Sequence, residues 1–141
     1  MTCEISFEGR SIQMNHRQFS NVIQFTLELA ESVAKSDEKE HVVHMSQLRD
    51  KEFWPGRGIQ IENDFPKIIE RKFWSKMFYD TARAVYNRDV GNHDHSYWQA
   101  QAIHQIYSTG QLFEYAVQQQ EPGWYADTMD RAEFNKVVNG S

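Results

Sequence analysis

The chain has 141 residues, of which 40% are hydrophobic, 13% aromatic and 25% charged, and its formal net charge is −5 with histidine neutral. A chain of this length buries about two thirds of the surface that its unfolded form exposes, so a core can hold it together without disulfides or a structural metal. With one cysteine, Cys3, an internal disulfide, a cysteine-based zinc site and a redox pair are all excluded.

No stretch of the sequence reaches the roughly 20 apolar residues that a membrane span requires. The opening MTCEISFEGR lacks the basic segment and apolar core of a secretion signal. We therefore expect one globular domain over residues 1–141, located in the cytoplasm and away from membranes.

The first predicted element is a β-hairpin over about residues 3–14. Apolar and polar residues alternate on both sides of a turn at Gly9-Arg10, which is the pattern of two half-buried strands. Because one hairpin is marginally stable in water, its apolar face must lie on another element. The apolar members of the pattern are Cys3, Ile5, Phe7, Ile12 and Met14.

A helix is predicted over about residues 16–35. Asn15 can cap it, and apolar residues recur at spacings of three and four from Phe19 to Ala34. They form one broad face, while the opposite face is polar, as in a helix that lies on a core.

Residues 36–62 are the hardest segment to assign. The charged run KSDEKE is typical of a solvated loop, and we expect one or two helical turns after it. Residues 54–58 must form a loop, because proline restricts the residue before it and two glycines favour irregular backbone. Ile59 and Ile61 fit a brief third strand.

A second long helix is predicted over about residues 64–88, started by Asn63 or Asp64 with Pro66 in the first turn. Its apolar arc is too wide for a single neighbour, which predicts a central position in the fold. The side chains expected in the core are Ile69, Phe73, Trp74, Met77, Phe78, Thr81, Ala82, Ala84 and Val85.

Two further helices are predicted, over about residues 95–119 and 128–138, and the segment 121–123 (Glu-Pro-Gly) separates them. The predicted fold class is therefore α+β and mostly helical. About four helices pack together with a small N-terminal β-hairpin.

The helix at 95–119 has an uncharged polar face. Between Ser96 and Gln120 the only charged residue is Glu114, whereas surface helices usually expose charges. Such a face is covered by another part of the chain or is open to a partner, because interface centres are poor in charge and rich in tyrosine. The candidate partner-binding residues are Gln101, His104, Ser108, Gln111, Tyr115 and Gln118.

Two other sets of residues have the chemistry of a surface that binds or attracts a partner protein. Trp54 and Arg57 lie on a glycine-softened loop and have the chemistry of interface anchors, although Trp54 also fits a position against the core. Acidic residues near the end of the sequence, among them Asp127 and Asp130, would steer a basic partner towards the surface.

Residues 49–88 are basic, with nine Lys and Arg against six Asp and Glu. A basic helix rich in aromatic residues raises the question of a nucleic-acid interface. The cations are spread around the helix and the chain as a whole is acidic, so we expect their long stems to cover apolar surface instead.

The alternative function class is a metal-dependent hydrolase. His41 with His44, and the string His93-Asp94-His95, supply imidazole and carboxylate groups of the kind that zinc, iron or manganese accept. The pair His93-Asp94 is similar to the His-Asp pair of helical metal phosphohydrolases of the HD type, in those two residues alone. Asp94 also fits as a helix cap. The nominal candidates for the further ligands are His44, Asp127 and Asp130.

The sequence contains neither a phosphate-binding loop nor a nucleophile elbow, and it predicts no cofactor. It favours a non-catalytic binding module, such as a small inhibitor or immunity-type protein that neutralises a basic toxin. The expected partner is another protein, basic in character, or a second copy of the chain. The metal-dependent hydrolase remains the alternative.

Overall fold

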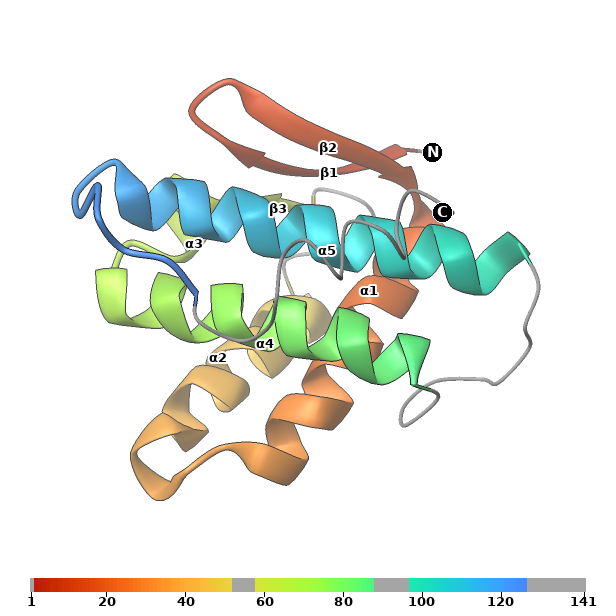
Figure 1. Ribbon diagram of the computed structural model, residues 1–141, viewed down its shortest axis with the longest axis horizontal. Coiled ribbons are helices and arrows are strands. Elements are labelled where there is room, and N and C mark those ends of the chain that lie inside the picture. The colour runs from red at the N-terminus through yellow and green to blue at the C-terminus, as the bar shows by residue number, and fades with distance from the viewer. Residues whose placement is uncertain (1, 52–57, 88–96, 127–141) are drawn as a thin grey trace.

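The computed structural model describes residues 2–51, 58–87 and 97–126 (Figure 1). The fold is α+β and mostly helical, with a small sheet at the N-terminal end, as the sequence predicts. Within this part of the chain, no helix combines the length and the apolar character that a bilayer crossing requires. The elements in chain order are β1 (Thr2–Phe7), β2 (Arg10–Asn15), α1 (His16–Val33), η1 (Ser36–Glu38), α2 (Lys39–Lys51), β3 (Ile59–Gln60), α3 (Ile61–Asp64), α4 (Ile68–Tyr86) and α5 (Tyr97–Gln118).

The sheet has three strands in the order β2-β1-β3, so β1 is central. Ile5 of β1 pairs with Ile12 of β2 in an antiparallel register and with Ile59 of β3 in a parallel one. The turn between β1 and β2 contains Glu8 at φ 47° and Gly9 at φ 89°, because a tight two-residue hairpin turn requires left-handed backbone. The predicted hairpin is confirmed, and a short third strand forms at Ile59.

The β1–β2 hairpin packs on α5. Figure 1 shows the two strands lying over this helix. The rings of Phe7 and Tyr115 meet edge to face with their centroids 6.0 Å apart, and the guanidinium carbon of Arg10 lies 4.0 Å from the centre of the Tyr115 ring. Each of these contacts contributes about 1 kcal/mol of stability beyond the effect of the surface area that it buries.

The long helices α4 and α5 pack side by side at the centre of the fold (Figure 1). Their contact is close at Gly110, where an added Cβ would lie 3.3 Å from the Cβ of Phe78. The Ser75 hydroxyl donates a hydrogen bond of 3.0 Å to the carbonyl of Gly110 at the same point. Phe65 and Phe78 each place their ring 5.3 Å from that of Phe113. The central position predicted for the second long helix is confirmed for α4.

Residues 36–62 hold more helix than the one or two turns expected from the sequence. Helix α2 has 13 residues and follows η1 directly. Its buried side chains are His41, Val42 and Met45. This apolar face is narrow and is interrupted by a histidine, so it does not stand out in the sequence as an amphipathic pattern.

The helix expected over residues 64–88 is divided in two. Phe65 leaves the helical region, with φ −132° and ψ 67°, because Pro66 restricts the residue before it. One expected core position is wrong as a result: Ile69, in the first turn of α4, is 66% exposed. The other expected core residues are buried, namely Phe73, Trp74, Met77, Phe78, Thr81, Ala82, Ala84 and Val85. The helix predicted at 128–138 lies outside the described residues.

A buried arginine joins three elements. Arg71 on α4 is 5% exposed, and its Nε donates a hydrogen bond of 2.6 Å to the carbonyl of Phe65. Its Nη1 donates one of 3.3 Å to the carbonyl of Ala116 on α5, and its guanidinium lies 5.2 Å from the ring centre of Phe7 on β1. Burial lowers the pKa of Arg71, while Glu8 and Glu62 act in the opposite direction.

Replacing Arg71 by leucine should lower the free energy of unfolding by about 3 kcal/mol, because two buried carbonyl groups lose a charged donor. Urea denaturation followed by circular dichroism measures this change. The matched control is Arg17→Met on the exposed face of α1, which should change stability by less than about 0.5 kcal/mol. Equal stability of the two variants would show that the Arg71 hydrogen bonds contribute nothing.

Gly58 brings β3 against β1. Its φ is +83°, and a Cβ built on it would overlap the carbonyl oxygen of Glu4 and lie 2.8 Å from the Glu4 nitrogen. Gly9 in the hairpin turn has a similar φ of +89°, but nothing lies within 4 Å of an added Cβ there. The two glycines therefore separate the cost of left-handed backbone from the cost of a steric clash.

Alanine at Gly9 should cost about 1–2 kcal/mol of stability, which is the conformational penalty alone. Alanine at Gly58 should cost more than about 3 kcal/mol, because the clash with Glu4 separates β3 from β1. Thermal unfolding of both variants, with amide hydrogen exchange at Ile5 and Ile59, tests this difference. Similar losses for the two variants would contradict the close approach at Gly58.

Candidate functional site

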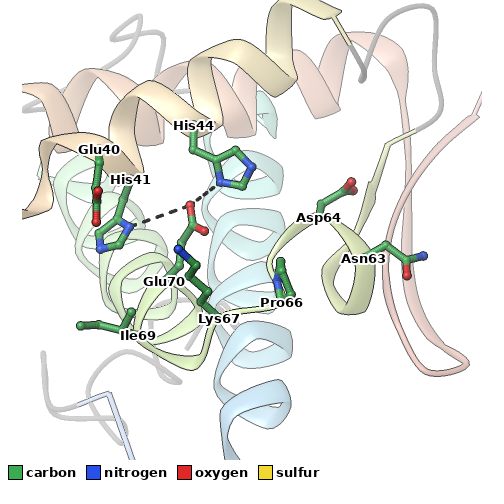
Figure 2. A pocket seen from close by; sticks show the side chains of 9 residues that line it. All are labelled: Glu40, His41, His44, Asn63, Asp64, Pro66, Lys67, Ile69 and Glu70. Atoms are coloured by element: carbon green, nitrogen blue, oxygen red, sulfur yellow. Dashed lines mark hydrogen bonds and ion pairs between the residues drawn. The ribbon is translucent and has the colours of Figure 1, made fainter.

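A surface pocket of about 490 Å³ lies between α2 and the segment that leads into α4 (Figure 2). Small-molecule sites in proteins commonly have volumes of about 300–1,000 Å³. Its lining comes from separate parts of the sequence, brought together by the packing of α2 on the start of α4. The lining residues are Glu40, His41, His44, Asn63, Asp64, Pro66, Lys67, Ile69 and Glu70.

Two histidines share one oxygen of a buried glutamate. His44 Nδ1 lies 2.5 Å from Glu70 Oε2, and His41 Nδ1 lies 3.9 Å from the same atom (Figure 2). The histidines are three residues apart on α2, so they project from one face of the helix. Glu70 is 5% exposed and lies in the first turn of α4, where the helix dipole stabilises a carboxylate.

Aromatic side chains hold both imidazole rings in position. The ring of His41 lies 5.0 Å from that of Phe73, and the ring of His44 lies 5.2 Å from that of Phe65. His41 is buried, whereas the His44 side chain is 34% exposed. His44 Nδ1 and Glu70 Oε2 form this hydrogen bond at the mouth of the pocket. The Nε2 atom then lies on the side of the ring turned away from Glu70 (Figure 2).

The lining of the pocket is negative. Glu40, Asp64 and Glu70 contribute three carboxylates, and Lys67 is the one lysine or arginine among the lining residues. Asp64 Oδ2 accepts a hydrogen bond of 2.8 Å from the backbone nitrogen of Gln60, which fixes the end of α3. The second oxygen of the buried carboxylate, Glu70 Oε1, accepts no hydrogen bond from the part of the chain that the structure describes.

The described part of the chain does not complete a metal centre around the two histidines of this pocket. In residues 2–51, 58–87 and 97–126, no three His, Cys, Asp or Glu side chains are placed so that they can hold a metal ion. His44, a residue of the alternative hydrolase hypothesis, forms a hydrogen bond with Glu70. The other residues of that hypothesis, His93, Asp94 and His95, lie outside the described residues.

The polar face predicted on α5 is partly covered by the chain itself. Gln101 accepts a hydrogen bond of 3.2 Å from Gln18 Nε2, and the half-buried Tyr115 packs against the hairpin. His104 and Gln111 are exposed, and Ser108 is half-buried. A second pocket, of about 230 Å³, adjoins this face and is rich in amide side chains. Its lining is Asn15, Arg17, Gln18, Asn21, Gln101, Ala102 and Gln105.

The single charged residue of the α5 segment, Glu114, is buried and forms hydrogen bonds within the fold. Glu114 is 5% exposed, and its Oε1 accepts a hydrogen bond of 3.2 Å from the hydroxyl of Tyr79. Its Oε2 accepts one of 2.8 Å from the backbone nitrogen of Ala126, so it ties the segment after α5 to the core. The remaining predicted partner residues, Trp54, Arg57, Asp127 and Asp130, lie outside the described residues.

Comparison with protein-family models, with curated proteins and with solved structures gives no match to this chain.

Sequence reasoning identified His44 and the shared direction of His41 and His44, but it missed their glutamate. Glu70 looks like one more charged residue on a basic helix. Its position in the first turn of α4 depends on the break at Phe65 and Pro66, which the sequence pattern did not place. A carboxylate four residues after a proline that precedes a long apolar pattern is a usable signal for an acid in the first turn of a helix.

A carboxylate with a shifted pKa lies outside the pocket, on α4. Burial raises the pKa of Asp80 to about 6, and the nearby charges of Lys76 and Arg83 oppose the shift. The folded protein therefore binds this proton more tightly than the unfolded chain, whose aspartate has a pKa of 3.8. Such a group destabilises the fold progressively as the pH rises from about 4 to about 6.

Asp80→Asn should raise the melting temperature at pH 8, where the carboxylate is charged, and should change it little at pH 4, where the native side chain is protonated. Differential scanning fluorimetry across this pH range measures the difference. Glu31→Gln, on the exposed part of α1, is the control and should show no such pH dependence. A gain for Asp80→Asn that is the same at both pH values would contradict the raised pKa.

Proposed function

We propose that this chain is a non-catalytic protein-binding module that acts in the cytoplasm and neutralises a basic protein, as small immunity and inhibitor proteins neutralise toxins. The observation that carries the proposal is the negative pocket at the start of α4. Three of its nine lining residues are carboxylates and one is a lysine. A concave negative site of this kind favours a cationic group of a partner.

The overall charge of the chain also supports a basic partner. A net charge of −5 attracts a basic partner over long distances and raises the rate of encounter. The same charge opposes the association of two copies, so a basic second protein fits better than a homodimer. Exposed acidic residues extend from the pocket along the preceding segment, at Asp37 and Glu40 of η1 and α2.

The rim of the pocket also has the apolar character of an interface. Ile69, which lines the pocket, is 66% exposed. Aliphatic side chains surrounded by charged groups are common where a partner excludes water. The alternative function, a metal-dependent hydrolase, gains no support from the described residues.

Native mass spectrometry of the tagged chain purified from its own host, with metal analysis of the same sample, tests the proposal. We expect a stoichiometric complex with one basic protein and no bound metal. The association rate of the purified pair should fall steeply as the salt concentration rises, because steering between opposite charges is screened.

Charge reversal provides the second measurement. Asp127→Lys with Asp130→Lys should slow association and reduce its dependence on salt. Glu28→Lys with Glu31→Lys gives the same net charge, so a difference between the two variants reports the position of the steering surface. Stoichiometric zinc, iron or manganese on a lone chain, or a partner whose association rate does not depend on salt, would overturn the proposal.

A further inference from the structure

Strand β2 forms an open edge of the sheet. The strand order is β2-β1-β3, and in the part of the chain that the structure describes no further strand pairs with β2 (Figure 1). Its six residues pair with β1 in continuous register, from Arg10 opposite Phe7 to Asn15 opposite Thr2. The edge therefore presents an uninterrupted row of main-chain groups.

Ser11 and Gln13 direct their main-chain N–H and C=O groups away from β1. In an antiparallel pair, residues that exchange hydrogen bonds with the neighbouring strand alternate with residues that do not. A Cβ built on Gly58 would meet the nitrogen and carbonyl oxygen of Glu4, so the main chain of Glu4 faces β3 and does not bond to the opposite residue, Gln13. Ser11 has the same orientation because it lies two residues earlier. Both residues are exposed, so an added strand can bond to them.

The edge lacks the features that usually prevent strand addition. Exposed edge strands are commonly protected by lysine, proline, a bulge or a charged side chain that points inward. The segment RSIQMN contains no lysine or proline, and its pairing with β1 shows no bulge. Its one charged residue, Arg10, lies next to the turn with its guanidinium on the Tyr115 ring. An extended main chain can therefore approach Ser11 and Gln13 without displacing a charged side chain of β2.

A polar helix face with little charge runs beside the strand. Arg10, at the start of β2, contacts Tyr115 towards the end of α5. Asn15, at the end of β2, lines the pocket of about 230 Å³ together with Gln101 in the first turns of α5. Strand and helix therefore run along each other in opposite directions. Between these two points the only Asp, Glu, Lys or Arg of α5 is the buried Glu114, so an added strand would meet amide and hydroxyl groups on this side.

The pocket at the end of β2 gives this surface a means of selecting a side chain. Its volume of about 230 Å³ is below the range of about 300–1,000 Å³ for small-molecule sites, so it fits one side chain better than a whole ligand. Five of its seven lining residues carry a side-chain amide, and none is acidic. The N–H of Asn15 donates to Gln18 Oε1 at 2.9 Å, so the free pairing positions end at this pocket. Amides both donate and accept, which favours an uncharged polar side chain.

We propose that β2 and the neighbouring face of α5 bind an extended, uncharged polar segment of a partner protein, which adds to the sheet as a further strand. Main-chain hydrogen bonds to Ser11 and Gln13 supply the affinity, and a serine, threonine, asparagine or glutamine side chain in the amide-lined pocket supplies the selectivity. A second copy of the chain fits less well, because each copy carries a net charge of −5. The inference rests on the proposed function for the existence of a partner, and it gives that partner a contact surface separate from the negative pocket.

The partner is unidentified, so the probe is a phage-displayed library of random 12-residue peptides, selected on the full chain. The discriminating variant is Gln13→Pro, which removes an outward N–H that β1 does not use and so keeps the pairing of β1 with β2. Selected peptides should be poor in charged residues and should bind Gln13→Pro at least about tenfold more weakly than the native chain, because a main-chain hydrogen bond is lost. The control Gln13→Thr keeps the N–H and should bind as the native chain does.

A second measurement requires no variant of the chain. Methylation of alternate main-chain nitrogens of a selected peptide should abolish binding in one phase and change it little in the other, because only every second residue of an added strand bonds to β2. The amide signals of Ser11 and Gln13 should shift on binding, and their hydrogen exchange should slow.

Selected peptides that bind Gln13→Pro and the native chain equally would overturn the inference, as would a selection without any binder or a dimer of the chain that Gln13→Pro dissociates. The outcome for the proposed function is separate. A basic host partner that binds Gln13→Pro as tightly as the native chain removes the edge site and leaves the proposed function intact. Peptide binding that depends on Gln13, without any basic partner in the host, supports the edge site and removes the proposed function.

Discussion

The buried guanidinium of Arg71 is the interaction on which the rest of the structure depends. It reaches the carbonyl of Phe65 before α4 and the carbonyl of Ala116 on α5, and it lies under Phe7 of the sheet. The backbone at Phe65 is not helical, so the Phe65 carbonyl accepts no hydrogen bond within a helix and is available to Arg71. Because Arg71 follows Glu70 directly, the contact that anchors the loop also fixes the place of the pocket carboxylate.

Much of the fold follows from local pattern. The alternation around Gly9 predicts the hairpin, and the wide apolar arc of the second long helix predicts its central position, since both are properties of neighbouring residues. The exposed position of Ile69 could not be predicted in this way. On a wheel it belongs to the apolar arc, but the break at Pro66 places it in a first turn that projects past the core.

The candidate site was harder to predict because its parts come together only in three dimensions. His41 and His44 share a helix face, and their spacing indicates that much. The glutamate that joins them lies on a different helix, and nothing in the sequence marks which of the many acidic residues will be buried. The polar face of α5 shows the opposite case. Its low charge is a real signal, but the structure shows that Gln18 and the hairpin use part of it.

The contact between Phe7 and Tyr115 has a consequence for how the chain reaches its fold. The two residues belong to opposite ends of the sequence, so closing this contact requires a large loss of chain entropy. During synthesis the hairpin emerges well before the helix α5 that packs on it. Helix α1 contacts both strands soon after they are made, but the part of their apolar side that α5 covers stays exposed until α5 has left the ribosome. Mutations that weaken the Tyr115 face should then lower the yield of folded protein in the cell more than they lower the stability of the finished molecule.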